Sequence, residues 1–355
     1  MTADTIPLRL EREPAPARPR HRDDSLPRGG RVGSWIVERE LGRGGMASVH
    51  AVAHSKLGGR AAIKIAHRSI FTEAYTPTTF LREARVARKV EHPGVIEVFA
   101  TGNHDGRPYL VVERLAGMPL GERVDAGPVP RLEALQVLIE LCDILRAAHA
   151  AGIVHRDLKL DNVFLLHAPY ADGKRVKLLD WGVAHVTGED DPFRGLIAGT
   201  LVYVAPELVR GDVVTPAADV YSLAVLAYHL LCRRPPFAAV SDLALISMHL
   251  RIEPPRASIA WPEIPQALDD LLIRMLAKAP AERPALDEVE RVLRGALDEV
   301  SPKAPPRPSL LARLTRTPPD DPFGRPIVPV PPFRPAWIGL ALALAGMAAV
   351  LTAFS

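Results

Sequence analysis

The stretch from His155 to Asn162 carries the side chains that a phosphoryl-transfer reaction requires. In such reactions the transition state is loose and its charge is spread over phosphate oxygens, so catalysis depends on positioning and counter-charge. Asp157 can take the proton of an attacking hydroxyl, Lys159 can neutralise the transferred phosphate, and Asn162 can ligate Mg²⁺. One such stretch can arise by chance, so the elements that bind a nucleotide must also be present.

A glycine-rich segment lies upstream, between the strand-like stretches 35–38 and 49–52. Glycines allow backbone N–H groups to close over phosphate oxygens without interference from Cβ atoms. An ordinary hairpin turn is the alternative, because a glycine-rich run alone is a weak signal. We expect the nucleotide to contact Leu41, Gly42, Arg43, Gly44, Gly45, Met46, Ala47, Ser48 and Val49.

Lys64 interrupts an apolar, strand-like stretch. A lysine in such a pattern needs a partner, because an unpaired buried charge is costly. The α- and β-phosphates of a nucleotide and a carboxylate on a neighbouring helix would provide one. Glu83 lies in a helix-forming stretch and is the preferred carboxylate. Glu73 is the rival, but it lies further from His92-Pro93, where the helix must end.

In this order, the motifs resemble those of the protein kinases, specifically the bacterial, Hanks-type relatives of eukaryotic Ser/Thr kinases. The resemblance covers roughly residues 34–298. It identifies Asp180 with the aspartate of the Asp-Phe-Gly element, although Trp181 replaces the phenylalanine and Ala47 replaces the third glycine of the phosphate loop. Further matches to the family are Gly199-Thr200, Ala205-Pro206-Glu207, Asp219 and Arg283.

The resemblance implies ATP as phosphoryl donor and Mg²⁺, with Mn²⁺ as an alternative, as its metal. It implies catalytic roles for Asp157, Lys159, Lys64 and Glu83. Asn162 and Asp180 would bind the metal, and the backbone at Glu113 and Leu115 would hold the adenine. The implied fold is α+β and bilobal, with a β-rich N-lobe at 34–115 and a helical C-lobe at 116–300.

Lys159, together with Thr200 after a glycine, favours protein Ser/Thr hydroxyls as substrates. We expect the Thr200 side chain to bond Asp157 and Lys159. Two alternatives remain. One is a pseudokinase scaffold that binds nucleotide without catalysis, and the other is a small-molecule kinase.

Arg156 is the residue that, in the family, usually pairs with a phosphorylated hydroxyl of the activation segment. Thr187 is the only hydroxyl residue between 182 and 199. The acidic run Glu189-Asp190-Asp191 could meet Arg156 without modification. A solvated acidic loop is the alternative reading of this run.

The composition is that of a globular domain with appendages: 355 residues, 48% hydrophobic and 24% charged. A net charge of +3 is too small to indicate a nucleic-acid partner, so none is expected. Cys142 and Cys232 lie in apolar helical patterns, which favours buried, reduced thiols over a disulfide or zinc site.

The two ends of the chain differ from the central part. We expect residues 1–33, rich in Pro and Arg, to be disordered, and they show no signal-peptide pattern. Residues 301–335 are rich in proline and predict an extended linker. The apolar run 336–354 predicts a transmembrane helix of about 28 Å. Arg334 favours a cytoplasmic kinase domain, hence a single-pass membrane protein.

A soluble helix docked on the kinase domain is the alternative for this apolar run, although the run has no polar face. Its many alanines could also pack closely against a second copy. A homodimer is therefore possible.

Overall fold

The computed structural model describes residues 24–72, 75–193 and 200–301. Its strands are β1 (Arg31–Val32), β2 (Trp35–Arg43), β3 (Ala47–His54), β4 (Arg60–Ala66), β5 (Val98–His104), β6 (Arg107–Val112), β7 (Gly117–Pro119), β8 (Ile153–Val154), β9 (Val163–Leu166), β10 (Val176–Leu178) and β11 (His185–Val186). Its α-helices are α1 (Pro77–Ala87), α2 (Leu120–Asp125), α3 (Arg131–Ala150), α4 (Pro206–Arg210), α5 (Ala217–Cys232), α6 (Asp242–Arg251), α7 (Gln266–Met275) and α8 (Leu286–Val300). Short 3₁₀ turns are η2 (Arg68–Ile70), η3 (Leu160–Asn162), η4 (Leu201–Tyr203), η5 (Ala257–Ile259) and η6 (Pro280–Glu282).

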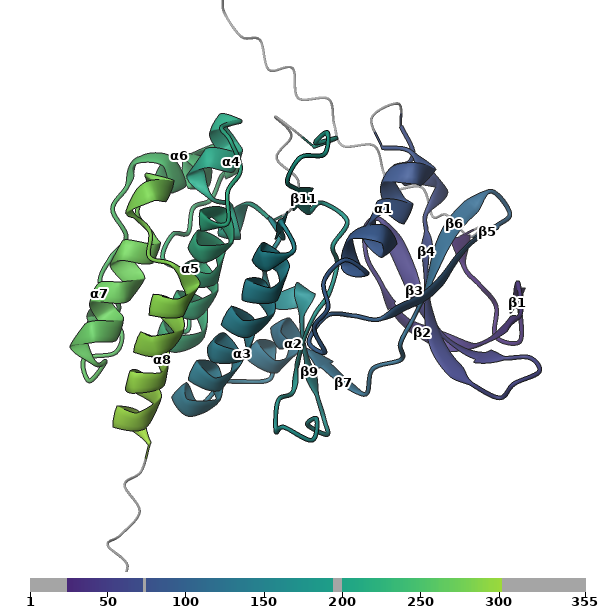
Figure 1. Cartoon of the computed structure of the whole chain (residues 1–355), viewed down its shortest axis with the longest axis horizontal. Helices are drawn as coiled ribbons and strands as arrows, with labels where there is room; N and C mark the ends of the chain where they lie inside the picture. The colour runs from purple at the N-terminus through teal and green to yellow at the C-terminus, as the bar shows by residue number, and fades with distance from the viewer. Residues whose placement is uncertain (1–23, 73–74, 194–199, 302–355) are drawn as a thin grey trace, which may run out of the picture. The chain divides into compact units, whose positions relative to one another are not determined.

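The first lobe is an antiparallel sheet with strand order β1-β2-β3-β4-β6-β5 and one helix, α1, packed against it (Figure 1). β4 is a central strand, and the register puts Lys64 opposite Val49 of β3 and Leu110 of β6. The β-branched residues of these strands suit a pleated, buried surface. Lys64 is therefore fixed by strand pairing on both sides.

The helix α1 begins at a strong N-terminal signal. Thr76 and Thr79 form a reciprocal capping box, and Pro77 occupies the first turn, where its missing N–H costs nothing. Phe80, Glu83 and Ala84 are among its buried residues. The apolar members of this face hold α1 on the sheet, and Glu83 is carried inward with them.

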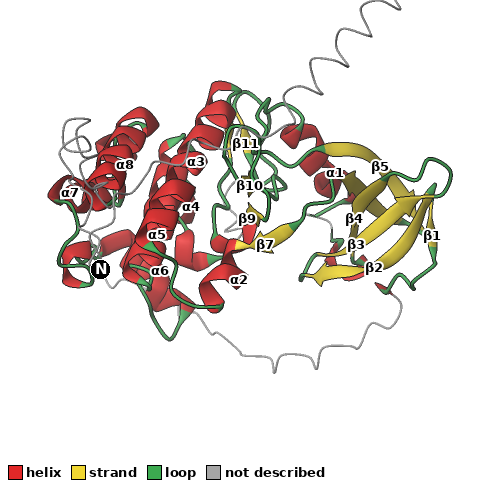
Figure 2. Ribbon diagram, turned by 90° about the horizontal axis from the view of Figure 1, so that it is seen from below, coloured by secondary structure: helices red, strands yellow, loops and turns green. Residues whose placement is uncertain are grey.

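The second lobe is helical (Figure 2). α5 is buried along almost its whole length and α3 along much of it, which explains their broadly apolar sequences. α8 is amphipathic and packs on α3 through residues such as Val289 and Leu293. Two small sheets, β10-β9-β7 and β11-β8, lie beside these helices and carry the loops of the site.

One expectation about the N terminus is wrong in part. Disorder was predicted for residues 1–33, but residues 24–33 are ordered. The buried Asp24 accepts hydrogen bonds from Arg107 through its carbonyl, at 2.9 Å, and its carboxylate, at 3.3 Å. Arg31–Val32 then pairs with β2. A buried ion pair and one short strand pairing are not visible in a composition dominated by Pro and Arg.

No helix within the described ranges combines the length and the apolarity needed to cross a bilayer. The predicted transmembrane helix, 336–354, lies outside those ranges, as does the predicted linker apart from Ser301.

Candidate active site

Lys64 has the carboxylate partner that the sequence predicted. Its Nζ lies 2.7 Å from Glu83 Oε2 and 3.3 Å from Asp180 Oδ1. Burial raises the pKa of Glu83 to about 7, although Lys64 opposes the shift. Burial also acts against the charge of Lys64, but Asp180 and Glu83 outweigh it and hold the Lys64 pKa above its usual value. The rival Glu73 lies outside the described residues.

Asp157 is held by two of the residues predicted beside it. Its Oδ2 accepts hydrogen bonds from Lys159 Nζ at 2.7 Å and from Asn162 Nδ2 at 2.9 Å. The same amide of Asn162 also donates to the Asp157 carbonyl at 2.8 Å. Because Leu179 N donates to the Asn162 carbonyl at 2.8 Å, Asn162 lies beside the loop that carries Asp180. The two predicted metal ligands are therefore neighbours.

The catalytic loop has an unusual backbone that Asp219 holds in place. Arg156 has φ of 66°, in the left-handed region that non-glycine residues rarely adopt. The fully buried Asp219 accepts from the backbone N–H groups of His155 and Arg156, both at 2.9 Å. Burial alone would raise the pKa of Asp219, but its hydrogen bonds, including one from His149, lower it. The sequence pattern did not single out His149.

The Trp181 side chain lies in the core. The indole is fully buried, and its centroid lies 4.7 Å from that of His155 in an edge-on arrangement. Its Nε1–H points to the carbonyl of Leu178 at 3.4 Å. The core therefore accommodates the indole ring that replaces the family's phenylalanine. Asp180, the residue before it, has φ of 59°, so this turn is also strained.

The glycine-rich segment is the hairpin between β2 and β3. Of its nine predicted contact residues, only Gly44, Gly45 and Met46 lie in the turn between the strands. His67 fixes this turn, because its backbone N–H donates to the Met46 carbonyl at 2.9 Å and its Nε2 lies 3.1 Å from the Gly44 carbonyl. Nothing in the sequence pattern singled out His67.

The segment after β6 was predicted to bind adenine through its backbone. Glu113 N–H donates to the Glu97 carbonyl at 3.0 Å, and the Glu113 side chain accepts from Glu97 N and Lys177. Within the described part of the chain, the Glu113 carbonyl and the Leu115 amide make no hydrogen bond. This pair can offer an acceptor and a donor to a planar base.

The oxygen donors of Asn162 and Asp180 fit a magnesium ion. Among the described residues, no three His, Cys, Asp or Glu side chains gather as a metal cluster. Mg²⁺ needs no such cluster, since it commonly takes one or two protein oxygens and completes its shell with phosphate and water. The Asn162 amide nitrogen is committed to Asp157, which leaves the amide oxygen as its ligand atom. Mn²⁺ accepts the same oxygen donors.

The later motifs form a brace between distant parts of the helical lobe. Arg283 donates to both carboxylate oxygens of Glu207, at 2.6 and 2.8 Å, and both side chains are buried.

The expectation for Thr200 fails: among the described residues its exposed side chain makes no hydrogen bond to Asp157 or Lys159. Those two residues instead bond each other.

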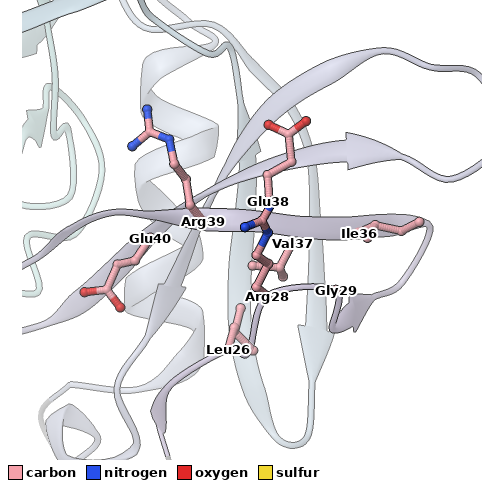
Figure 3. Close-up of a pocket in the computed structure, with 8 residues that line it drawn as sticks. All are labelled: Leu26, Arg28, Gly29, Ile36, Val37, Glu38, Arg39 and Glu40. Carbon is pink, nitrogen blue, oxygen red and sulfur yellow. The ribbon is translucent and has the colours of Figure 1, made fainter.

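A hollow of about 620 Å³ lies away from these residues, between β2 and the segment that precedes β1 (Figure 3). Its lining includes Leu26, Val37, Glu38 and Arg39. None of the proposed catalytic or metal-binding side chains faces it, so it has no part in the site.

Comparison with known proteins gives one consistent result. A family model for the protein kinase domain matches residues 35–292. The chain is 39% identical over 300 residues to the serine/threonine-protein kinase Pkn1 of Myxococcus xanthus, covering 82% of this chain and 42% of Pkn1. It is 31% identical over 310 residues to PknB of Mycolicibacterium smegmatis, covering 83% of this chain and 48% of PknB.

Among solved structures, the Mycobacterium tuberculosis PknI kinase domain matches with a TM-score of 0.60 at 27% identity. The match covers 77% of this chain and all of that domain. The chain spans less than half the length of Pkn1 and PknB. The lobes described above are those of a protein-kinase fold, and the chain belongs to the protein kinase family, among the bacterial relatives of eukaryotic Ser/Thr kinases.

Proposed function

We propose that this protein is an ATP-dependent serine/threonine protein kinase. The observation that carries the proposal is the arrangement of Asp157, whose carboxylate is fixed by Lys159 and Asn162 in a loop that also adjoins Asp180. A carboxylate held in this way can orient a substrate hydroxyl and accept its proton.

The other residues of the site support the nucleotide. Lys64, kept charged and oriented by Glu83, binds the α- and β-phosphates of ATP. The turn at Gly44–Met46 closes over the phosphates, and the backbone at Glu113 and Leu115 binds the adenine. When bound at Asn162 and Asp180, Mg²⁺ neutralises charge on the phosphate oxygens.

A pseudokinase scaffold is the second candidate. A scaffold that only binds nucleotide has no need for Asp157 or for the lysine beside it, yet both are present and hydrogen-bonded to each other. This pair favours catalysis. A small-molecule kinase is the third candidate, and the family's named relatives, which are protein kinases, argue against it.

Radiolabelled ATP tests the proposal directly. The protein is supplied with Mg²⁺ and with general acceptor proteins, and in parallel with small hydroxyl-bearing metabolites. Label on Ser or Thr of the proteins is expected, and chelation of the metal should abolish it. Label on metabolites alone would favour the small-molecule kinase, and nucleotide binding without label would favour the scaffold.

We also propose that the chain is anchored in the membrane by one C-terminal helix, residues 336–354, with the kinase domain in the cytoplasm. The uninterrupted apolar run, Trp337 near its start and Arg334 before it support this orientation. Pairing of two such helices would make a homodimer.

A further inference from the structure

The acidic run Glu189–Asp191 contains one buried ion pair. Asp191 accepts two parallel hydrogen bonds from Arg156, at 2.7 and 2.9 Å, and the two side chains are only 10% and 6% exposed. The backbone N–H of Phe193 adds a third, at 3.0 Å. Burial alone would raise the pKa of Asp191, but the bonds from Arg156 and Phe193 lower it. The carboxylate is therefore ionised at neutral pH.

Glu189 makes a different connection. It accepts from Arg85 at 3.0 Å and from Lys89 at 2.6 Å, on the last turn of α1 and just beyond it. Both cations are exposed, so these pairs are weak compared with the buried one. Asp190 is exposed and has no ion pair or hydrogen bond within the described residues. The three acids, which look alike in the sequence, have three different environments.

The segment after Asp180 is thus tied to both halves of the site. Asp191 fastens it to Arg156, the neighbour of Asp157, while Glu189 fastens it to the helix that carries Glu83. Arg156 also donates to the Val183 carbonyl at 2.8 Å, so it holds the start of the segment as well as Asp191. All the negative charges in these contacts come from unmodified Glu and Asp side chains, so no phosphate group is needed to form them.

We propose that Asp191 is a positioning residue that holds this segment and the catalytic loop in their working arrangement, so that phosphoryl transfer requires no prior phosphorylation of the segment. The inference rests on the proposed kinase function. Bidentate, charge-assisted bonds between a carboxylate and a guanidinium are directional as well as strong, so they fix an orientation in addition to a distance.

The surroundings of Arg156 disfavour a phosphate as its partner. A hollow of about 250 Å³ beside it is lined by all three acids, and also by His185. Burial lowers the pKa of His185, so this imidazole is neutral at pH 7. A phosphate entering the hollow would meet carboxylates, and the guanidinium is already neutralised by Asp191.

Thr187 is the only hydroxyl residue between 182 and 199. It does not line the hollow beside Arg156. Its backbone N–H donates to the Gly152 carbonyl at 2.8 Å, and its side chain is exposed. Among the described residues no hydrogen bond joins Thr187 to Arg156, whose NH1 and NH2 groups already bond Asp191.

The first test uses the full-length chain, stripped of phosphate by a phosphatase and checked by mass spectrometry. Initial rates of peptide phosphorylation should be linear from the first time point and unchanged by preincubation with MgATP. Thr187→Ala should behave in the same way. A lag that preincubation removes, with Thr187→Ala remaining slow, would overturn the inference while leaving the kinase function intact. No transfer under any condition would overturn both.

The second test compares matched variants in the same run of acids. Asp191→Asn should lower kcat by about 10- to 100-fold with little change in KM for ATP, and Asp191→Glu should recover part of the loss. Asp190→Asn is the control and should stay within about 2-fold of wild type. All three variants are checked for ATP binding and thermal unfolding, which reveals a general folding defect. Equal kcat values for Asp191→Asn and Asp190→Asn would contradict the assignment.

Discussion

At the scale of single residues, the site depends on carboxylates whose environments set their charge. Glu83 and Asp180 both face Lys64, yet burial raises the pKa of Glu83 whereas the pKa of Asp180 is lowered. Burial would raise the pKa of Asp180 as well, but the charge of Lys64 and its hydrogen bond to Asp180 lower that pKa by more. Asp180 therefore remains an anion that can bind a metal, whereas Glu83, with a pKa of about 7, is partly protonated at neutral pH.

The raised pKa of Glu83 predicts an acidic limb in the activity profile. A carboxyl group with a pKa of about 7 becomes neutral as the pH falls through that value and then holds Lys64 less firmly. At saturating Mg²⁺, kcat/KM for ATP should fall between about pH 8 and about pH 6. The measurement is an initial-rate profile over this range.

Glu83→Gln provides the control for this profile. Its amide does not titrate, so its activity should be lower than that of wild type and nearly flat with pH. An acidic limb of the same size in Glu83→Gln would mean that another group is responsible.

At the scale of secondary-structure elements, the helical lobe is braced by the Glu207–Arg283 pair, which joins the start of α4 to the loop before α8. Arg283 also donates to the Ala217 carbonyl at 2.8 Å, at the start of α5. Three elements that are far apart in the sequence are thus held by one guanidinium. Since both charges are buried, neither can be removed without leaving the other uncompensated.

Arg283→Met should therefore destabilise the protein by about 3–5 kcal/mol, measured by urea unfolding. Arg294→Met is the matched control, because Arg294 is 60% exposed and its partner Glu290 keeps a second cation, Arg146. Its cost should be below about 1 kcal/mol. Similar decreases in the free energy of unfolding for the two variants would show that burial does not strengthen the Glu207–Arg283 pair.

Elements with a strong local signal were predictable from sequence. The helix containing Glu83 has an apolar face and ends before Pro93, and Lys64 stood out because a cation in an apolar strand needs a partner. The contacts of His67 with the glycine-rich turn and of His149 with Asp219 were not predictable. Each depends on residues brought together by the fold, and a lone histidine carries no spacing that would indicate its partner.

The acidic run shows the same limit more sharply. The sequence indicated that one of three adjacent acids could meet Arg156, but gave no means of choosing among them. The choice is made by the path of the chain between β11 and Phe193, which turns Asp191 inward and leaves Asp190 exposed. The expected Thr200 contacts depended in the same way on the path of the chain, which leaves the Thr200 side chain exposed while Lys159 bonds Asp157 Oδ2.

At the scale of the whole molecule, the chain combines a kinase domain with a C-terminal apolar run that the proposal places in a membrane. A variant ending at Val300 should leave the membrane fraction, because residues 336–354 are the only strongly apolar run of that length in the sequence. Fractionation followed by carbonate extraction is the measurement.

Leu344→Arg in the full-length chain is a narrower version of the same test. An arginine at the centre of a spanning helix costs about 2.5–3.5 kcal/mol, so insertion should be reduced. Full-length protein that carbonate removes from membranes would contradict a spanning helix, as would membrane retention of the variant ending at Val300.

The proposed kinase activity requires that Asp157 act on the acceptor hydroxyl and not on the nucleotide. Asp157→Asn keeps the shape of the side chain but removes the base, so transfer of label from ATP to protein should be lost while ATP binding stays near the wild-type value. Lys64→Met, compared in parallel, should lose both. Phosphoryl transfer by Asp157→Asn at the wild-type rate would contradict a role for Asp157 as the base.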